Sequence, residues 1–313
     1  MNAKKVNWLY LSMVLFEAAI FAFFVIFGRY IYLGVIESLL ISQAIILIPT
    51  VLFLVITRTR PSQMIPLRKM RFTSIILTVV VTYLFFPLII TANAFSMLFV
   101  DNEVNQLNAS LEGLPLWAIL LIIGIFGPLS EEFCFRGVIY HGYRRSGRIV
   151  GAVLLSALLF GVTHLNFNQM SYAIIVGICC AALIECTGNI ISAMLFHIII
   201  NTTSTVMSYF SDTSGLTQAE LEAKIELSTN MSYREAMSVS VAIYLMISVV
   251  TVTIAICLMY LIAKSEGRIG HLKSIWPAEK QNRKKKLISV PLLIALLICF
   301  AYMIFDVIMQ FAT

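Results

Sequence analysis

Long apolar runs alternate with short polar segments along almost the whole chain. An α-helix of about 20 residues crosses the ~30 Å hydrocarbon core of a bilayer, and most of these runs reach that length. The pattern therefore predicts an all-α polytopic transmembrane helical bundle of about eight to nine spans. The predicted spans are 9–28, 33–56, 72–100, 116–140, 149–164, 170–186, 190–210, 239–263 and 287–311.

The composition places the whole chain in the membrane class. Sixty per cent of the residues are hydrophobic and 12% are charged, whereas soluble domains carry about 25% charged residues. We therefore expect a single integral membrane domain over residues 1–313, without a soluble module. The longest polar stretch, 211–238, predicts one short helix at 216–228. All six cysteines lie in apolar runs, which predicts buried side chains rather than disulfides.

The basic residues are unevenly distributed among the polar segments. With a cytoplasmic N-terminus, 18 of the 22 Lys and Arg residues fall in the cytoplasmic segments 4–5, 58–71, 144–148 and 264–286. This agrees with the positive-inside rule. We expect a protein of the cell membrane whose N-terminus is cytoplasmic and whose C-terminus, for nine spans, is external. The net charge of +6 then reports orientation, and nucleic acid is not an expected partner.

Three charged residues interrupt the apolar run 116–140. Glu131, Glu132 and Arg136 lie inside it, although a charge at the centre of a bilayer costs at least about 2.5 kcal/mol. Such residues usually face a cavity and mark a functional site. Pro128 is expected to kink this helix, and Ser130 to cap the turn that restarts after it. A broken helix at this depth favours an internal polar chamber.

The spacing of the charges separates their expected roles. Glu132 and Arg136 are four residues apart and share a helix face, which predicts a structural ion pair. Glu131 points about 100° away from Glu132, so its partner has to come from another helix. His164 and His197 are the candidates. An unpaired carboxylate beside an imidazole suits a general base.

Three motifs resemble those of a known family. Glu131-Glu132-x-x-x-Arg136, Phe160-x-x-x-His164 and His197-x-x-x-Asn201 look like the motifs of the CPBP family. These are the CAAX proteases and bacteriocin-processing (Abi) enzymes, related to the Ras-converting CAAX protease. The resemblance covers residues 116–203, which we regard as the catalytic core.

The resemblance implies an intramembrane endopeptidase that acts on a membrane-associated peptide or protein, such as a prenylated or leader-type substrate. Glu131 and His164 would activate a water molecule. His197 and Asn201 would donate hydrogen bonds to the oxyanion, and Glu132 and Arg136 would give structural support. This glutamate-type mechanism requires no cofactor.

Other interpretations stay open at this point. Glu131, His164 and His197 could together bind zinc, although no H-E-x-x-H motif is present. The chain could instead be a non-proteolytic immunity or scaffold protein that binds a peptide or membrane partner. Buried Glu and His residues also occur in proton-coupled transporters, but no inverted repeat is evident. Neither the substrate nor the oligomeric state follows from the sequence.

Overall fold

The computed structural model describes residues 2–31, 33–102, 107, 110, 111, 113–211 and 216–312, with no side-chain detail at 63, 311 and 312. Over these residues the chain forms helices and connecting loops, without strands. Eight helical stretches of this described part are long and apolar enough to cross a membrane. The predicted all-α polytopic bundle is thereby confirmed.

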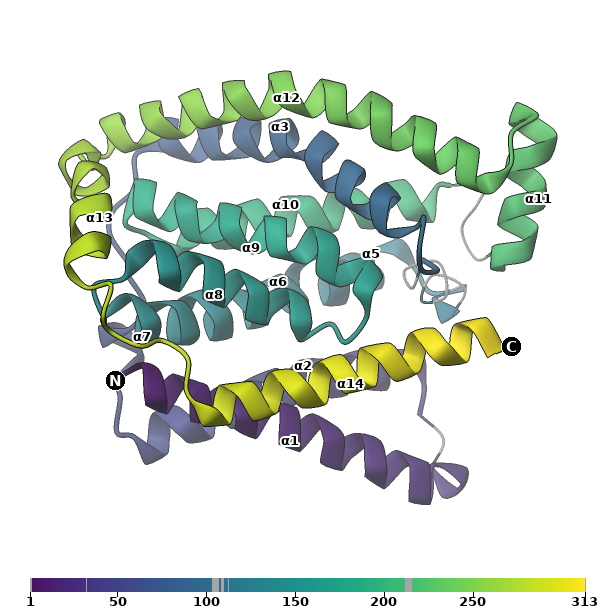
Figure 1. Ribbon diagram of the computed structural model, residues 1–313, viewed down its shortest axis with the longest axis horizontal. Helices are drawn as coiled ribbons and strands as arrows, with labels where there is room; N and C mark the ends of the chain where they lie inside the picture. The colour runs from purple at the N-terminus through teal and green to yellow at the C-terminus, as the bar shows by residue number, and fades with distance from the viewer. Residues whose placement is uncertain are drawn as a thin grey trace.

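The helices are arranged in layers (Figure 1). Helices α1 (Ala3–Phe27), α2 (Val35–Ile56) and α14 (Val290–Ala312) form one side of the bundle. Helices α3 (Phe72–Ser96) and α12 (Tyr233–Ser265) pack together on the opposite side. The motif-bearing helices lie between these two layers, as does the most buried span, Phe167–Thr187.

The fourth span is one long helical stretch that is partly widened into π-helix. It comprises α5 (Leu116–Ile119), η3 (Leu120–Phe126), α6 (Gly127–Glu132), η4 (Phe133–Tyr140) and α7 (His141–Arg144), of which η3 and η4 are π-helical. The predicted cap at Ser130 is wrong, because its hydroxyl donates to the Phe126 carbonyl at 2.8 Å within a continuous helix. π-helical turns often mark functional sites, and here they flank the two glutamates.

The fifth predicted span is shorter than expected. Helix α8 covers Ile149–Val162, which at 1.5 Å per residue is about 21 Å and less than a bilayer core. The chain then turns through Leu165, whose φ of 56° lies in the left-handed region, and enters α9 (Phe167–Thr187). Helix α10 (Ile190–Tyr209) follows after a tight turn at Gly188.

The polar segments contain short helices of their own. The predicted helix at 216–228 is α11 (Gln218–Thr229), which begins at a capping box of Thr217 and Glu220. A second capping box, formed by Ser232 and Glu235, starts α12 six residues earlier than the predicted span. Burial, together with the Glu222 carboxylate, raises the pKa of Asp101 near this end of the bundle.

The basic segment 264–286 also contains a helix, α13 (Ile269–Gln281), which the sequence did not predict. The remaining short elements are the 3-10 turns η1 (Gly28–Tyr30) and η2 (Pro61–Gln63). Helix α13 lies at the same end of the bundle as the N-terminus and α7, whereas α11 and the C-terminus lie at the other end (Figure 1).

A buried carboxylate ties α13 to the bundle. Glu185, near the end of α9, accepts hydrogen bonds from Arg144 at 2.6 and 3.0 Å, from Tyr140 and from His271. The His271 side chain is partly buried at this contact. His141 is also partly buried, with its Nδ1 on the Arg136 carbonyl oxygen.

Candidate active site

The candidate site joins the fourth span and α10 through one ion-pair cluster. Glu131 and Glu132 come from α6, Arg136 from η4 and His197 from α10. Glu132 Oε1 lies 3.0 Å from Arg136 Nη1, and both side chains are fully buried. The i,i+4 ion pair expected from the sequence is therefore present.

His197 connects the two glutamates. Its Nδ1 lies 2.9 Å from Glu132 Oε1, and its Nε2 lies 3.6 Å from Glu131 Oε2. A carboxylate can only accept, so Nδ1 carries a proton and donates to Glu132. The imidazole is 5% exposed, whereas Glu131 retains 14% exposure. Glu131 is therefore the carboxylate of the pair that water or a ligand can reach.

The structure places the other two candidate residues next to this cluster but in separate contacts. His164 Nδ1 lies 2.9 Å from the Phe160 carbonyl oxygen. Asn201 Nδ2 donates to the Ile123 carbonyl in η3 at 3.2 Å. Among the described residues, the imidazole in contact with Glu131 is that of His197, and no contact joins Glu131 to His164.

Phe160 forms the aromatic centre of the site. Its ring lies 5.1 Å from the His164 ring and 5.6 Å from the His197 ring, both edge-on. The Arg136 guanidinium lies 4.3 Å from the ring centroid, within the range of a cation–π contact. Phe160 is part of the second motif, but the sequence did not predict that its ring would contact the side chains of His164, His197 and Arg136.

A glycine allows the buried arginine to fit. A Cβ added to Gly177 in α9 would lie 2.9 Å from Ala157 and 3.0 Å from Arg136 Nη2. Both distances are shorter than ordinary contacts, so a larger residue at 177 would displace α8 or the guanidinium. Helices α8 and α9 therefore pack closely around Arg136.

One family model matches the part of the chain that carries the candidate site. Residues 113–203 match the family described as "Type II CAAX prenyl endopeptidase Rce1-like". This segment therefore resembles that family, and we refer to it as the Rce1-like segment. The match confirms the resemblance to CAAX proteases, and it supports a CAAX-type intramembrane endopeptidase as the general class. No curated protein and no solved structure matches the chain.

A three-ligand metal site is not assembled in the described part of the Rce1-like segment. No three His, Cys, Asp or Glu side chains of the described residues lie close enough together to hold a metal ion. Glu131 and His197 approach each other, but His164 does not join them. A catalytic zinc site usually has three protein ligands, so the arrangement does not fit the zinc set that the sequence left open.

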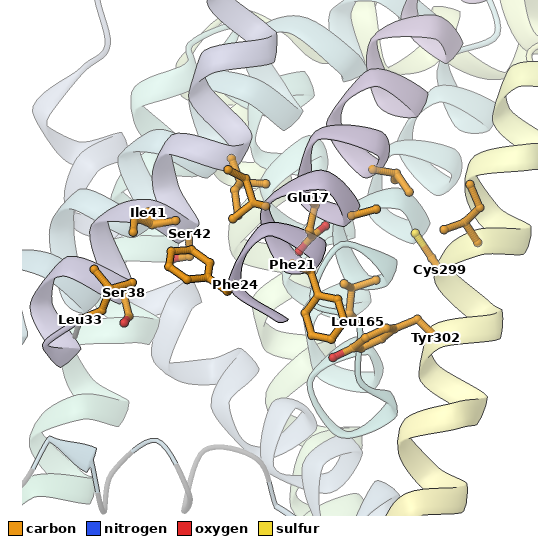
Figure 2. A pocket seen from close by; sticks show the side chains of 15 residues that line it. Glu17, Phe21, Phe24, Leu33, Ser38, Ile41, Ser42, Leu165, Cys299 and Tyr302 are labelled. Atoms are coloured by element: carbon orange, nitrogen blue, oxygen red, sulfur yellow. The ribbon is translucent and has the colours of Figure 1, made fainter. Parts of the chain in front are cut away.

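An apolar cavity lies next to the Rce1-like segment. Its volume is about 430 Å³, and it is lined mainly by α1, α2 and α14 together with Leu165. Figure 2 shows the Glu17 carboxylate among mostly apolar side chains. Leu165 directly follows His164 in the chain, so the cavity borders the turn that carries this candidate residue.

Proposed function

We propose that the protein hydrolyses peptide bonds within the membrane, with Glu131 as the general base. The observation that carries the proposal is the contact of His197 with both Glu131 and Glu132. It holds a partly accessible carboxylate beside an imidazole in an otherwise buried cluster. This is the arrangement that proton abstraction from water requires.

The charges of the cluster support this role. Two carboxylates face Arg136 and His197, and each imidazole nitrogen of His197 points toward one glutamate. Such fixed donors in a site of low exposure act strongly on developing charge. The 3.6 Å separation between His197 Nε2 and Glu131 is longer than a hydrogen bond, which leaves His197 free to donate to an incoming oxygen.

The proposed reaction uses water as the nucleophile. Glu131 takes one proton while the water oxygen bonds to the peptide carbonyl carbon. His197 and Asn201 donate to the oxyanion that forms. The C–N bond then breaks, and the proton held by Glu131 passes to the leaving nitrogen. His164, whose Nδ1 is engaged by Phe160, presents its Nε2 to the same water molecule.

The substrate is a membrane-associated peptide or protein with an apolar group. The cavity that Leu165 borders has mostly apolar walls and a volume of about 430 Å³, which suits a lipid chain or large apolar side chains. Prenylated C-terminal tails and leader-type peptides are the two classes to compare. No additional cofactor is needed for these steps.

The decisive experiment compares purified wild type with Glu131→Gln on both classes of peptide. The amide keeps the shape of the side chain but cannot accept the proton, so cleavage falls to background. Glu37→Gln is the matched control, because Glu37 is also a glutamate in a membrane helix and its side chain is exposed. We expect this variant to keep the wild-type turnover. Monodispersity in detergent shows that each variant is folded.

Two results would contradict the proposal. Cleavage by folded Glu131→Gln at the wild-type rate would exclude Glu131 as the base. A cellular phenotype that folded Glu131→Gln retains in full would favour the non-proteolytic immunity or scaffold role.

A further inference from the structure

Buried polar atoms that make no hydrogen bond concentrate at the candidate site, and they include Arg136 Nη1, which still forms the ion pair with Glu132. In the described part of the chain, eight buried side-chain nitrogen or oxygen atoms lack a hydrogen-bond partner. Five of them belong to Arg136, Glu132 and Gln43. Buried polar groups are normally paired, so each exception calls for an explanation. Arg136 and Glu132 belong to the cluster described above, whereas Gln43 lies in α2, outside the Rce1-like segment.

The Gln43 amide approaches α6 beside Gly127, where the missing side chain leaves a small notch. A Cβ placed on Gly127 would lie 3.7 Å from Gln43 Nε2 and 4.0 Å from Glu131 Oε1. Both atoms therefore face the same small space beside α6. Helices α2 and α6 are in contact, so this approach is part of the packing of the bundle.

The two oxygens of Glu131 have different neighbours. Oε2 faces His197 Nε2, whereas Oε1 borders the notch that Gln43 Nε2 also borders. An amide nitrogen is a donor and a carboxylate oxygen an acceptor. We propose that Gln43 is a positioning residue that holds the Glu131 carboxylate at Oε1 through one water molecule in the shared space, and thereby aims Oε2 at the reacting water. This inference rests on the proposed function of Glu131.

A purely structural role for Gln43 explains the contacts less well. A glutamine within a membrane helix is costly unless it is paired, and Gln43 Oε1 is buried without a partner among the described residues. A leucine of similar size would remove that unpaired oxygen. A buried amide oxygen without a partner beside a candidate base is an exception that a functional role would explain.

The test is Gln43→Leu, studied with a peptide that the wild type cleaves and Glu131→Gln does not. We expect kcat to fall by at least ten-fold, up to about 10²-fold for a misplaced catalytic group, while KM stays within two-fold. The unfolding temperature should stay the same or rise. Gln310→Leu is the matched control, since Gln310 pairs with Asp306 on α14, and its kcat should equal that of the wild type.

The outcomes separate this inference from the proposed function. Wild-type kcat in folded Gln43→Leu, with Glu131→Gln inactive, would overturn the role of Gln43 and leave that of Glu131 intact. Cleavage by Glu131→Gln would overturn both. A lower unfolding temperature with reduced yield would identify Gln43 as structural. If Gln43→Leu does not fold, Gln43→Met gives the same comparison with a more flexible side chain, and a failure of both to fold also counts against the proposal.

Discussion

The buried arginine shows how single residues shape the site. Arg136 is fully buried, pairs with Glu132 at 3.0 Å and lies over the Phe160 ring. Glu132 is shared with His197, so one carboxylate serves both a structural cation and a candidate catalytic group. Removing one member of a buried pair usually costs roughly 3–5 kcal/mol, because the other charge stays buried without a partner.

This argument predicts different results for single and double substitutions. Arg136→Met should lower the yield of monodisperse protein, because it leaves Glu132 without its cation. Arg136→Met combined with Glu132→Gln should recover much of that yield, because both charges are gone. The double variant should still lack cleavage, since His197 has lost the Glu132 carboxylate. Equal yields for both variants would show that the ion pair does not stabilise the fold.

At the scale of helices, most of the long helices could be predicted from the sequence, because a helix that crosses a bilayer must be long and apolar. A span needs a minimum apolar length, so the runs in the sequence located the long helices, and polar caps set the start of α11 and α12. The π-helical turns around Gly127–Glu132 were not predictable, because they depend on packing against other helices. Likewise, the motif spacing identified the site residues, but it could not show which histidine would contact Glu131.

Helix α8 depends on a contact from a distant segment. Its first turn lacks a side-chain cap of its own. Glu279 of α13 supplies one, because its Oε2 accepts from the Val150 and Gly151 amides at 3.0 and 3.3 Å. Its Oε1 accepts from Arg148 Nε at 3.0 Å. A helix that carries Phe160 is thus anchored by a helix more than a hundred residues later in the chain.

Glu279→Ala should therefore loosen the start of α8. Loss of an N-cap costs about 0.5–2 kcal/mol, which should speed hydrogen exchange of the first α8 amides several-fold. Lys280→Ala is the matched control, because Lys280 is the next residue along α13 and its ammonium lies over the Trp276 ring of the same helix. Exchange measured by mass spectrometry on peptides covering 148–155 reports the effect. Equal exchange in the two variants would mean that Glu279 does not cap α8.

The whole molecule brings its basic segments together at one end. The Arg71 amide donates to Glu266, Arg148 pairs with Glu279, and Lys285 donates to the Ser146 carbonyl. These contacts place the segments 58–71, 144–148 and 264–286 on the same side of any bilayer that the bundle crosses. Helix α11 lies at the opposite end (Figure 1). The positive-inside rule then predicts that the basic end is cytoplasmic.

Labelling of single cysteines tests this orientation. Cys257 is the exposed native cysteine and the other five are buried, so Cys257→Ser gives a background with little reactivity toward a charged maleimide. In that background, Glu222→Cys on α11 should react in intact cells, whereas Lys273→Cys on α13 should react only after permeabilisation. Both positions are exposed, so a difference in labelling reports the side of the membrane and not burial. If Lys273→Cys reacts in intact cells and Glu222→Cys does not, the orientation is the opposite of the predicted one. The contacts of Glu185 with Arg144 and His271 would then lie on the external side.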